Sequence, residues 1–179
     1  MRIHGHGTGF TVIELMVTIS IAAVLLVTGI PSFQQFTFAQ EMKAAIGSLH
    51  NDLLMGRSEA VSFNVRVVSC PGDPVEGCSG SIDWSSGWIV FADDNADRQY
   101  QKAETMIRHG QGYKNMRIQG SVGRTDIRFF PDGSTPGSNG SISFCGAGGP
   151  EKARKLIISN LGRIRRDAAE GLDPAFCPT

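Results

Sequence analysis

The densest group of chemically active side chains is a basic stretch near the C-terminus. In this stretch a single acid, Glu151, accompanies six cations: Lys152, Arg154, Lys155, Arg163, Arg165 and Arg166. Gly162 precedes Arg163 and allows a tight backbone turn, so we expect an exposed loop that presents the arginines. A guanidinium group donates two parallel hydrogen bonds to phosphate oxygens. The stretch is therefore a candidate phosphate-binding site.

The residues around this stretch favour contact with a nucleic-acid backbone over contact with bases. Phe176 is the nearby aromatic residue, so base stacking has little support and binding should be sequence-independent and salt-sensitive. Strand alternation would place only some of Lys152, Arg154 and Lys155 on one side, which makes them weaker candidates than the arginines. A structural alternative stays open, in which a solvated strand pairs its arginines with the acids that follow: Asp167, Glu170 and Asp173.

A second polar group has the spacing of a calcium-binding loop. Positions 1, 3, 5 and 12 of such a loop are occupied by Asp93, Asn95, Asp97 and Glu104. However, position 6 holds Arg98 where glycine is expected, and no flanking helices are predicted. An acidic turn is the favoured interpretation, and we expect neither a metal nor another cofactor.

No set of residues has the spacing of a catalytic group. The histidines are scattered along the chain: His4, His6, His50 and His109. No Ser/His/Asp or Cys/His arrangement is suggested by spacing, and no glycine-rich phosphate loop follows a predicted strand. We therefore expect a protein that is not an enzyme.

The cysteines indicate an oxidising compartment. The chain has four of them, and all follow the apolar N-terminal stretch: Cys70, Cys78, Cys145 and Cys177. Zinc would require closer Cys-x-x-Cys pairs or histidine partners, which the sequence lacks. Two disulfides are the simpler interpretation, and we favour the pairs Cys70–Cys78 and Cys145–Cys177, although sequence alone does not fix connectivity.

The N-terminal region has an unusual order of charge, small residue and apolar run. Residues 10–33 are almost continuously apolar and long enough to cross a bilayer as a helix. An ordinary secretory signal ends in its cleavage site, whereas here the small residue Gly9 precedes the apolar run. Cleavage there would remove residues 1–9 and leave the membrane helix on the mature chain. One carboxylate, Glu14, lies inside the run, where a charge is costly and usually functional.

The segment Gly9-Phe10-Thr11-Val12-Ile13-Glu14 resembles the prepilin signature of the type IV pilin superfamily. The resemblance implies that a prepilin peptidase cuts after Gly9 and that the new N-terminal residue, Phe10, is methylated. It also implies that Glu14 pairs with the terminal amine of a neighbouring subunit, since an unpaired carboxylate in apolar surroundings is costly. Pro31 fits the family as well, because it permits a kink or local melting of the helix.

The rest of the chain is expected to form one α+β domain. Its 179 residues suffice for one domain with a core, and an apolar stripe extends the helix to about Ser58: Met42, Ile46, Leu49 and Leu53. Strands are predicted over residues 61–70, 87–91, 115–119, 126–130, 141–145 and 155–159, with a turn-rich connection over residues 131–140. We expect a mainly antiparallel sheet packed on the helix, in a periplasmic domain of residues 34–179.

Three stretches of this domain resemble the GspH/FimT branch of the pilin superfamily, and with the N-terminus they cover nearly the whole chain. They are Trp84 with residues 87–91 and an acidic turn, residues 129–133, and residues 161–165 before Cys177. Gly162-Arg163-Ile164-Arg165 resembles the Gly-Arg-x-Arg motif with which FimT-type minor pilins bind DNA for uptake in natural transformation.

The function that these resemblances imply is that of a FimT-like minor type IV pilin. Its expected partners are other pilin subunits, the prepilin peptidase, the bacterial inner membrane and double-stranded DNA. The globular domain would be periplasmic and later exposed on a pilus. The alternative is a structural minor pilin or type II secretion pseudopilin that initiates or caps a filament without binding DNA. The equal numbers of basic and acidic residues, 17 each, do not separate the two.

Overall fold

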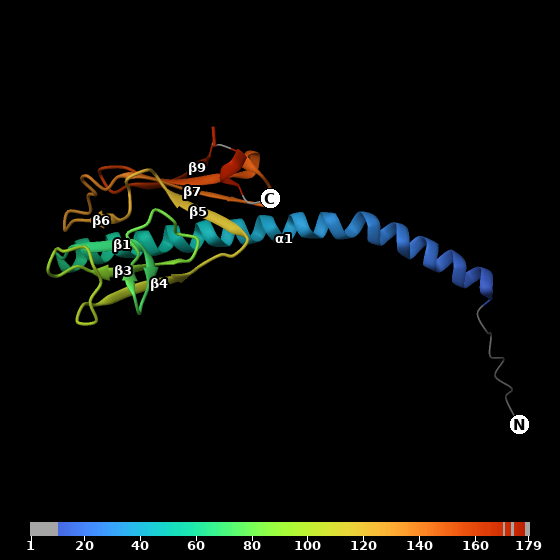
Figure 1. Ribbon diagram of the computed structural model, residues 1–179, viewed down its shortest axis with the longest axis horizontal. Helices are drawn as coiled ribbons and strands as arrows, with labels where there is room; N and C mark the ends of the chain where they lie inside the picture. The colour runs from blue at the N-terminus through green and yellow to red at the C-terminus, as the bar shows by residue number, and fades with distance from the viewer. Residues whose placement is uncertain (1–10, 170, 173, 178–179) are drawn as a thin grey trace, which may run out of the picture. The chain divides into compact units, whose positions relative to one another are not determined.

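A computed structural model describes residues 11–169, 171–172 and 174–177, and among these it leaves the side chains of residues 27–32 undescribed. The chain divides into two units, residues 1–37 and residues 38–179, and one long helix contributes to both. This helix, α1, spans Val12–Phe63 (Figure 1). Thr11 caps its N-terminus, because the Thr11 Oγ1 accepts a hydrogen bond of 3.3 Å from the backbone N–H of Glu14. The predicted helix of residues 10–58 is therefore confirmed, and its C-terminal end extends to Phe63.

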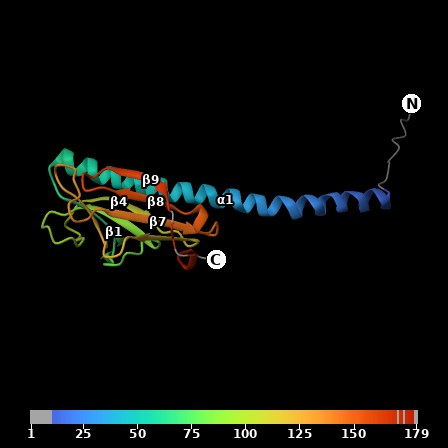
Figure 2. The same ribbon diagram turned by 90° about the horizontal axis from the view of Figure 1, so that it is seen from above.

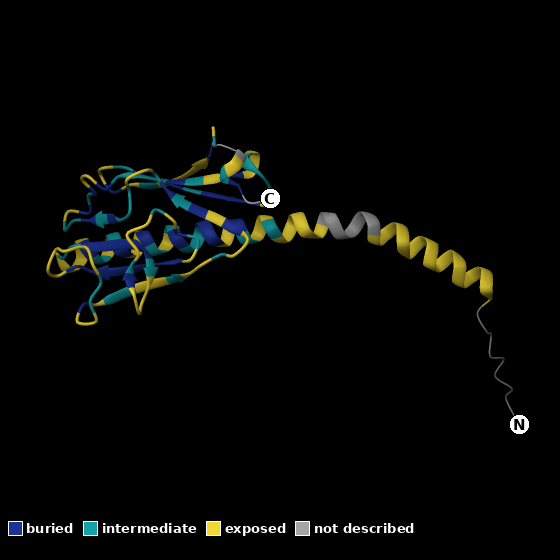
Figure 3. Cartoon of the chain, in the orientation of Figure 1, coloured by how far each residue is buried: buried dark blue, intermediate teal, exposed yellow. Residues whose placement is uncertain are grey.

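The first unit consists of the N-terminal part of α1. Its described large apolar side chains are solvent-exposed, from Val12 to Leu26 and at Phe33 and Phe36 (Figure 3). Among the described residues, no helix is both long enough and apolar enough to cross a membrane. Residue 10 and the side chains of residues 27–32 belong to the predicted membrane segment and lie outside the description. The membrane segment thus stays a prediction.

The end of α1 corrects one sequence prediction. Residues 61–70 were expected to be a strand, but the helix continues through Phe63. The core packing of Ala60 extends the helix, and Asn64 ends it by adopting a left-handed conformation with φ 55°. The N–H of Val65 then reaches back to the carbonyl of Ala60 at 3.2 Å, which closes the last turn. The first strand consequently begins only at Val67.

The second unit contains two antiparallel sheets (Figure 2). The first sheet has the order β2-β1-β3-β4, with β6 also paired to β1. Its strands are β1 (Val67–Asp73), β2 (Gly77–Cys78), β3 (Gly87–Ala92), β4 (Met106–Gln111) and β6 (Ile127–Phe129). Strand β3 is buried along its whole length, as its continuous apolar run predicts.

The second sheet has the order β5-β7-β8-β9, so β5 and β9 are its edges. Its strands are β5 (Met116–Gly120), β7 (Gly140–Gly146), β8 (Arg154–Ile158) and β9 (Ile164–Ala168). Two short 3-10 helices, η1 (Pro150–Lys152) and η2 (Pro174–Phe176), flank its last strands. Its inner face carries buried apolar side chains at alternate positions, including Ile142, Phe144 and Leu156.

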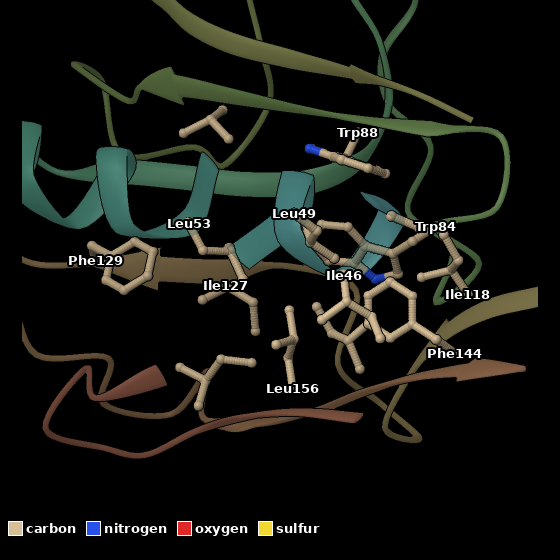
Figure 4. Packing of buried hydrophobic residues seen from close by; sticks show 14 of the residues in the cluster. Ile46, Leu49, Leu53, Trp84, Trp88, Ile118, Ile127, Phe129, Phe144 and Leu156 are labelled. Carbon is tan, nitrogen blue, oxygen red and sulfur yellow. The ribbon is translucent and has the colours of Figure 1, made fainter. Parts of the chain in front are cut away.

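The core lies between α1 and the inner faces of the two sheets (Figure 4). The predicted apolar stripe of α1 is buried as expected: Met42, Ile46, Leu49 and Leu53. Trp88 packs within the core and its indole N–H donates to the Asp52 carboxylate at 2.9 Å. This bond satisfies a buried polar atom and sets the position of the helix relative to β3.

The four cysteines form two disulfides. Cys70 bonds to Cys78 and holds β1 to β2, and Cys145 bonds to Cys177 and fastens the C-terminal segment to β7. These are the pairs that the sequence favoured. In the described part of the chain no cysteine is free. Cross-links of this kind each stabilise a small domain by roughly 2–4 kcal/mol.

Candidate nucleic-acid interface

The basic stretch is built as a hairpin of β8 and β9 rather than as one extended loop. The strands pair in the register Lys155↔Asp167, Leu156↔Arg166 and Ile157↔Arg165. Only Arg163 adjoins the turn, whereas Arg165 and Arg166 lie within β9. The expectation of a loop that presents all three arginines is therefore wrong. The strand forms because the backbone groups on its inner edge pair with β8, whatever the charge of its side chains.

The turn depends on Gly162 for two physical reasons. Gly162 has φ 72°, a conformation that side chains disfavour. A Cβ added to it would also lie 1.9 Å from the carbonyl oxygen of Gly133 and 2.9 Å from Nε of Arg57. The glycine of the Gly-Arg-x-Arg motif is thus required by packing, and it carries no information about DNA by itself.

Arg57 of α1 fastens two loops to the helix. Its Nε donates to the Gly133 carbonyl at 2.9 Å, and its Nη2 donates to the Leu161 carbonyl at 3.3 Å. The same two loops are joined directly, because the N–H of Thr135 donates to the carbonyl of Asn160 at 2.8 Å. The hairpin turn is therefore held in place by the body. The sequence pattern does not reveal this role of Arg57, because its two partners are 76 and 104 residues away along the chain.

The strand register places only some of the six predicted cations on one face of the second sheet. On β8, Lys155 and Ile157 alternate with the buried Leu156 and Ile158, so Lys155 and Ile157 point to the outer face of the second sheet. Arg165 pairs with Ile157 and therefore lies on the same outer face. Arg163 precedes β9, but its carbonyl accepts a hydrogen bond of 3.0 Å from the Ser159 N–H, so we extend the alternation to it and place it on the same side. Together these three residues are termed the outer-face cations.

The other three cations do not join this group. Arg166 has the opposite parity and donates from Nη2 to Nδ1 of His50 on α1 at 3.3 Å. An arginine only donates, so His50 accepts with its Nδ1 in this contact. Arg154 lies at the start of β8 and donates to the Ala153 carbonyl at 2.9 Å, and Lys152 lies in η1.

One acid partly neutralises the outer-face cations. Nη2 of Arg165 lies 3.9 Å from Oδ2 of Asp167, and the two side chains are 55% and 45% exposed. An exposed pair at this distance contributes at most about 1 kcal/mol. The structural alternative is therefore realised for Asp167, whereas Glu170 and Asp173 lie outside the described residues. Within the described chain, Arg163 has no ion pair of its own.

Most polar groups of the acidic turn at residues 93–104 bond within the turn, although both carboxylate oxygens of the buried Asp93 have no hydrogen-bond partner among the described residues. Asn95 and Gln101 donate to the Asp97 carboxylate, and the backbone N–H groups of Asp94 and Gln101 donate to Glu104. A hydrogen bond from the Gln99 backbone lowers the pKa of Asp97 below its usual value, with smaller contributions from Gln101 and Asn95. The described residues contain no group of acids, histidines or cysteines that could hold a metal ion, so the candidate calcium loop gains no support.

The residues predicted to process and assemble the chain lie in or near the first unit. Gly9 and Phe10 fall outside the described residues. Glu14 is solvent-exposed in the first turn of α1. At Pro31 the backbone is helical, so the predicted membrane segment and amphipathic segment form one helix. The assembly roles of Glu14 and Pro31 stay predictions.

The fold defines the class of the protein: one long helix against antiparallel sheets is the arrangement of pilin-like subunits. The GspH family, described as type II transport protein GspH, matches residues 45–162, and the chain belongs to this family. It is accordingly a minor pilin or pseudopilin of the GspH/FimU type, and not an enzyme, as the sequence predicts. Membership in this family implies contact with other pilin subunits.

Individual relatives agree with this assignment. The pilin-like protein PilA1 of Thermus thermophilus is 27% identical over 163 residues, which cover 88% of this chain and 96% of the relative. The type IV minor pilin FimU of Pseudomonas aeruginosa shares the fold with a TM-score of 0.60 at 21% identity, over 75% of this chain and 93% of FimU. The minor pseudopilin EpsH of Vibrio cholerae gives a TM-score of 0.52 at 12% identity, over 73% of this chain and 98% of EpsH.

Proposed function

We propose that this chain is a minor type IV pilin that binds double-stranded DNA without sequence preference, in the manner of FimT. The observation that carries the proposal is the placement of Arg163 and Arg165 on one exposed face beside a fixed turn. Each guanidinium group can donate two hydrogen bonds to the oxygens of one phosphate group. Because the turn is already fixed, binding does not require it to change conformation. DNA uptake in natural transformation is the process that such a subunit would serve.

The proposal includes the maturation and location of the subunit. A prepilin peptidase would cleave after Gly9, Phe10 would be methylated, and residues 10–33 would hold the chain in the bacterial inner membrane before assembly. The domain of residues 34–179 would then be periplasmic and later displayed on the pilus. Glu14 would select the subunit register by pairing with the terminal amine of a neighbour.

A second candidate function is supported by two specific observations. Gly162 is required by its contact with Gly133, and Asp167 already pairs with Arg165. Both features are also expected in a purely structural minor pilin or type II secretion pseudopilin that initiates or caps a filament. The relatives FimU and EpsH are a minor pilin and a minor pseudopilin respectively, so the fold is compatible with either role.

The deciding experiment compares two charge-matched variants of the full chain in detergent. Arg163→Gln with Arg165→Gln removes two cations from the outer face of the second sheet. Arg154→Gln with Arg166→Gln removes two cations of the opposite strand parity, one from β8 and one from β9. Binding of fluorescent duplexes of unrelated sequence is measured at about 50 mM and about 200 mM salt.

The proposal expects binding by the parent chain that weakens steeply with salt and is independent of sequence. The Arg163/Arg165 variant should lose this binding, and the Arg154/Arg166 variant should keep most of it. Equal loss in both variants would indicate a diffuse charge effect. No binding by the parent chain at low salt would favour the structural subunit instead.

A further inference from the structure

The second unit contains a cavity that the basic hairpin does not use. Its volume is about 580 Å³, within the range of small-ligand sites, and it lies between the segment before β3 and the segment around the start of β5. The chemically active side chains that line it are Asp83, Ser86, Tyr113, Lys114 and Arg117. We propose that Lys114 and Arg117 form a second phosphate-binding site here, so that one DNA segment is held at both edges of the second sheet.

The charges of this cavity favour an anion. Neither Lys114 nor Arg117 makes an ion pair within the described part of the chain. Among the described residues that line the cavity, Asp83 is the only acid, and its Oδ1 accepts a hydrogen bond from the Ser85 backbone at 2.9 Å; Glu41 and Asp52 of α1 act on Tyr113 from outside the lining. The cavity therefore presents two cations whose charge is not neutralised by contact with a carboxylate, which is the composition expected for a phosphate site.

The cavity is also ordered by aromatic contacts. The guanidinium carbon of Arg117 lies 5.8 Å from the ring centre of Phe176, in the segment that the Cys145–Cys177 disulfide fastens. The Tyr113 ring stacks on Trp88 with centroids 6.4 Å apart. Burial, followed by the charges of Glu41 and Asp52, raises the pKa of Tyr113, so its hydroxyl stays protonated and can donate to an oxyanion.

The strand register relates the cavity to the outer-face cations. Arg117 pairs with Cys145, and its parity places it on the same outer face as Lys155 and Arg165. Along this face the cations run diagonally, from Arg165 on β9 through Lys155 on β8 to Arg117 on β5. Between the last two lies β7, where the residue that pairs with Lys155 is the uncharged Ser143.

The length of this diagonal fits a short stretch of duplex. Three strand spacings give about 14 Å across the sheet and four residues give about 13 Å along it, so Arg165 and Arg117 are roughly 20 Å apart at the backbone. Duplex DNA has one base pair per about 3.4 Å, and the diagonal therefore corresponds to about six base pairs. The inference rests on the proposed DNA binding and adds a site that the Gly-Arg-x-Arg motif does not contain.

The test replaces the cavity cations in the full chain, in detergent, by Lys114→Gln with Arg117→Gln. The matched control is Lys102→Gln with Arg108→Gln, which removes two exposed cations from the first sheet and its neighbouring turn. Affinity for duplexes of increasing length is measured at several salt concentrations. Arg117→Lys serves as a conservative variant that retains the charge.

The inference expects about tenfold weaker binding in the Lys114/Arg117 variant, and a salt dependence reduced by about two counterions. Duplexes shorter than the diagonal should bind the parent chain and this variant equally, whereas longer ones should distinguish them. The Lys102/Arg108 control should match the parent chain, and Arg117→Lys should recover part of the loss.

The outcomes that overturn the inference are separable from failure of the proposed function. Unchanged duplex affinity in the Lys114/Arg117 variant, with loss in the Arg163/Arg165 variant, overturns the second site and leaves DNA binding standing. If the cavity binds free phosphate instead of DNA, duplex affinity should again be unchanged in the Lys114/Arg117 variant. In that case the nuclear magnetic resonance signals of Lys114 and Arg117 should shift when inorganic phosphate is added to the parent chain, and the DNA site is overturned. Absence of DNA binding by the parent chain overturns both proposals.

Discussion

The hairpin turn at residues 159–163 and the acidic turn at residues 93–104 both have a sequence pattern that suggests a binding site, but they are built in opposite ways. The hairpin turn is fixed from outside, by Arg57 and by the loop around Gly133. Its one charged side chain, Arg163, is not needed to hold the turn and is solvent-exposed. In the acidic turn, the side chains of Asp97 and Glu104 accept hydrogen bonds from within the turn.

This difference shows how a candidate site can be judged. A polar side chain that holds its own loop together is already engaged, and a ligand would have to compete with that hydrogen bond. A polar side chain on a loop held by other residues is free to bind without a change of conformation. By this criterion Arg163 is a better candidate for binding than Asp97 and Glu104, whose carboxylates hold the acidic turn together.

The largest effect is expected from Gly162→Ala, which tests the external support of the hairpin turn. The new methyl group would meet the Gly133 carbonyl at 1.9 Å and force strain at φ 72°. We expect the free energy of unfolding to fall by about 3 kcal/mol or more, measured by urea unfolding. Gly123→Ala is the matched control, because Gly123 has φ 75° with open space around it, and it should cost only about 1 kcal/mol. Equal costs would mean that the contact with Gly133 is unimportant.

A smaller effect is expected from Arg57→Ala. The change leaves two loop carbonyls, those of Gly133 and Leu161, without their donor. The free energy of unfolding should fall by about 2 kcal/mol, and amide exchange should accelerate in the hairpin turn. Lys102→Ala, on the exposed surface of the acidic turn, should change stability by less than about 0.5 kcal/mol. Unchanged exchange in the hairpin turn would show that Arg57 does not support it.

Much of the body could be predicted because it follows local patterns. The stripe from Met42 to Leu53 repeats with helical spacing, and the run in β3 is apolar and short. Two edge strands, β4 and β9, were missed for one reason. Strand β4 is largely exposed and β9 carries two arginines and an aspartate, so neither shows the alternation that marks a half-buried strand.

The candidate site could be predicted by residue type but not by arrangement. The sequence indicated which residues are basic, yet the division between Arg165 and Arg166 depends on the register of β9 against β8. A slip of one residue would exchange their faces. The support from Arg57 and the position of Arg117 are equally invisible, since both depend on contacts between distant parts of the chain.

A still smaller effect is expected from Asp167→Asn, which removes the acid nearest to Arg165. The pair is 3.9 Å long and half-exposed, so stability should change by less than about 0.5 kcal/mol. Duplex affinity should instead rise by about threefold, because Arg165 is released for phosphate. Asp94→Asn removes the same charge from the acidic turn and should leave affinity unchanged. A similar gain in both variants would mean that total charge, rather than the outer face, governs binding.

The smallest expected effect concerns acid pH. Protonation of a carboxylate should perturb amides beyond its own loop near the hairpin turn, but only local amides in the acidic turn. Hydrogen bonds from the Ser134 hydroxyl and backbone lower the pKa of Asp132, and the Gln99 backbone lowers that of Asp97, both from a usual value of 3.8. A folded-state pKa below the unfolded value means that each carboxylate stabilises the fold above about pH 3.8 and loses this contribution as the pH falls through the lower folded value. In nuclear magnetic resonance titrations from about pH 5 to about pH 2, protonation of Asp132 should perturb the amides of Asn160 and Gly162, because the loop of Asp132 is bonded to the hairpin turn. Protonation of Asp97 should perturb only its own turn. In Asp132→Asn the hairpin amides should no longer titrate, and persistence of their titration would place its origin outside the linked loops.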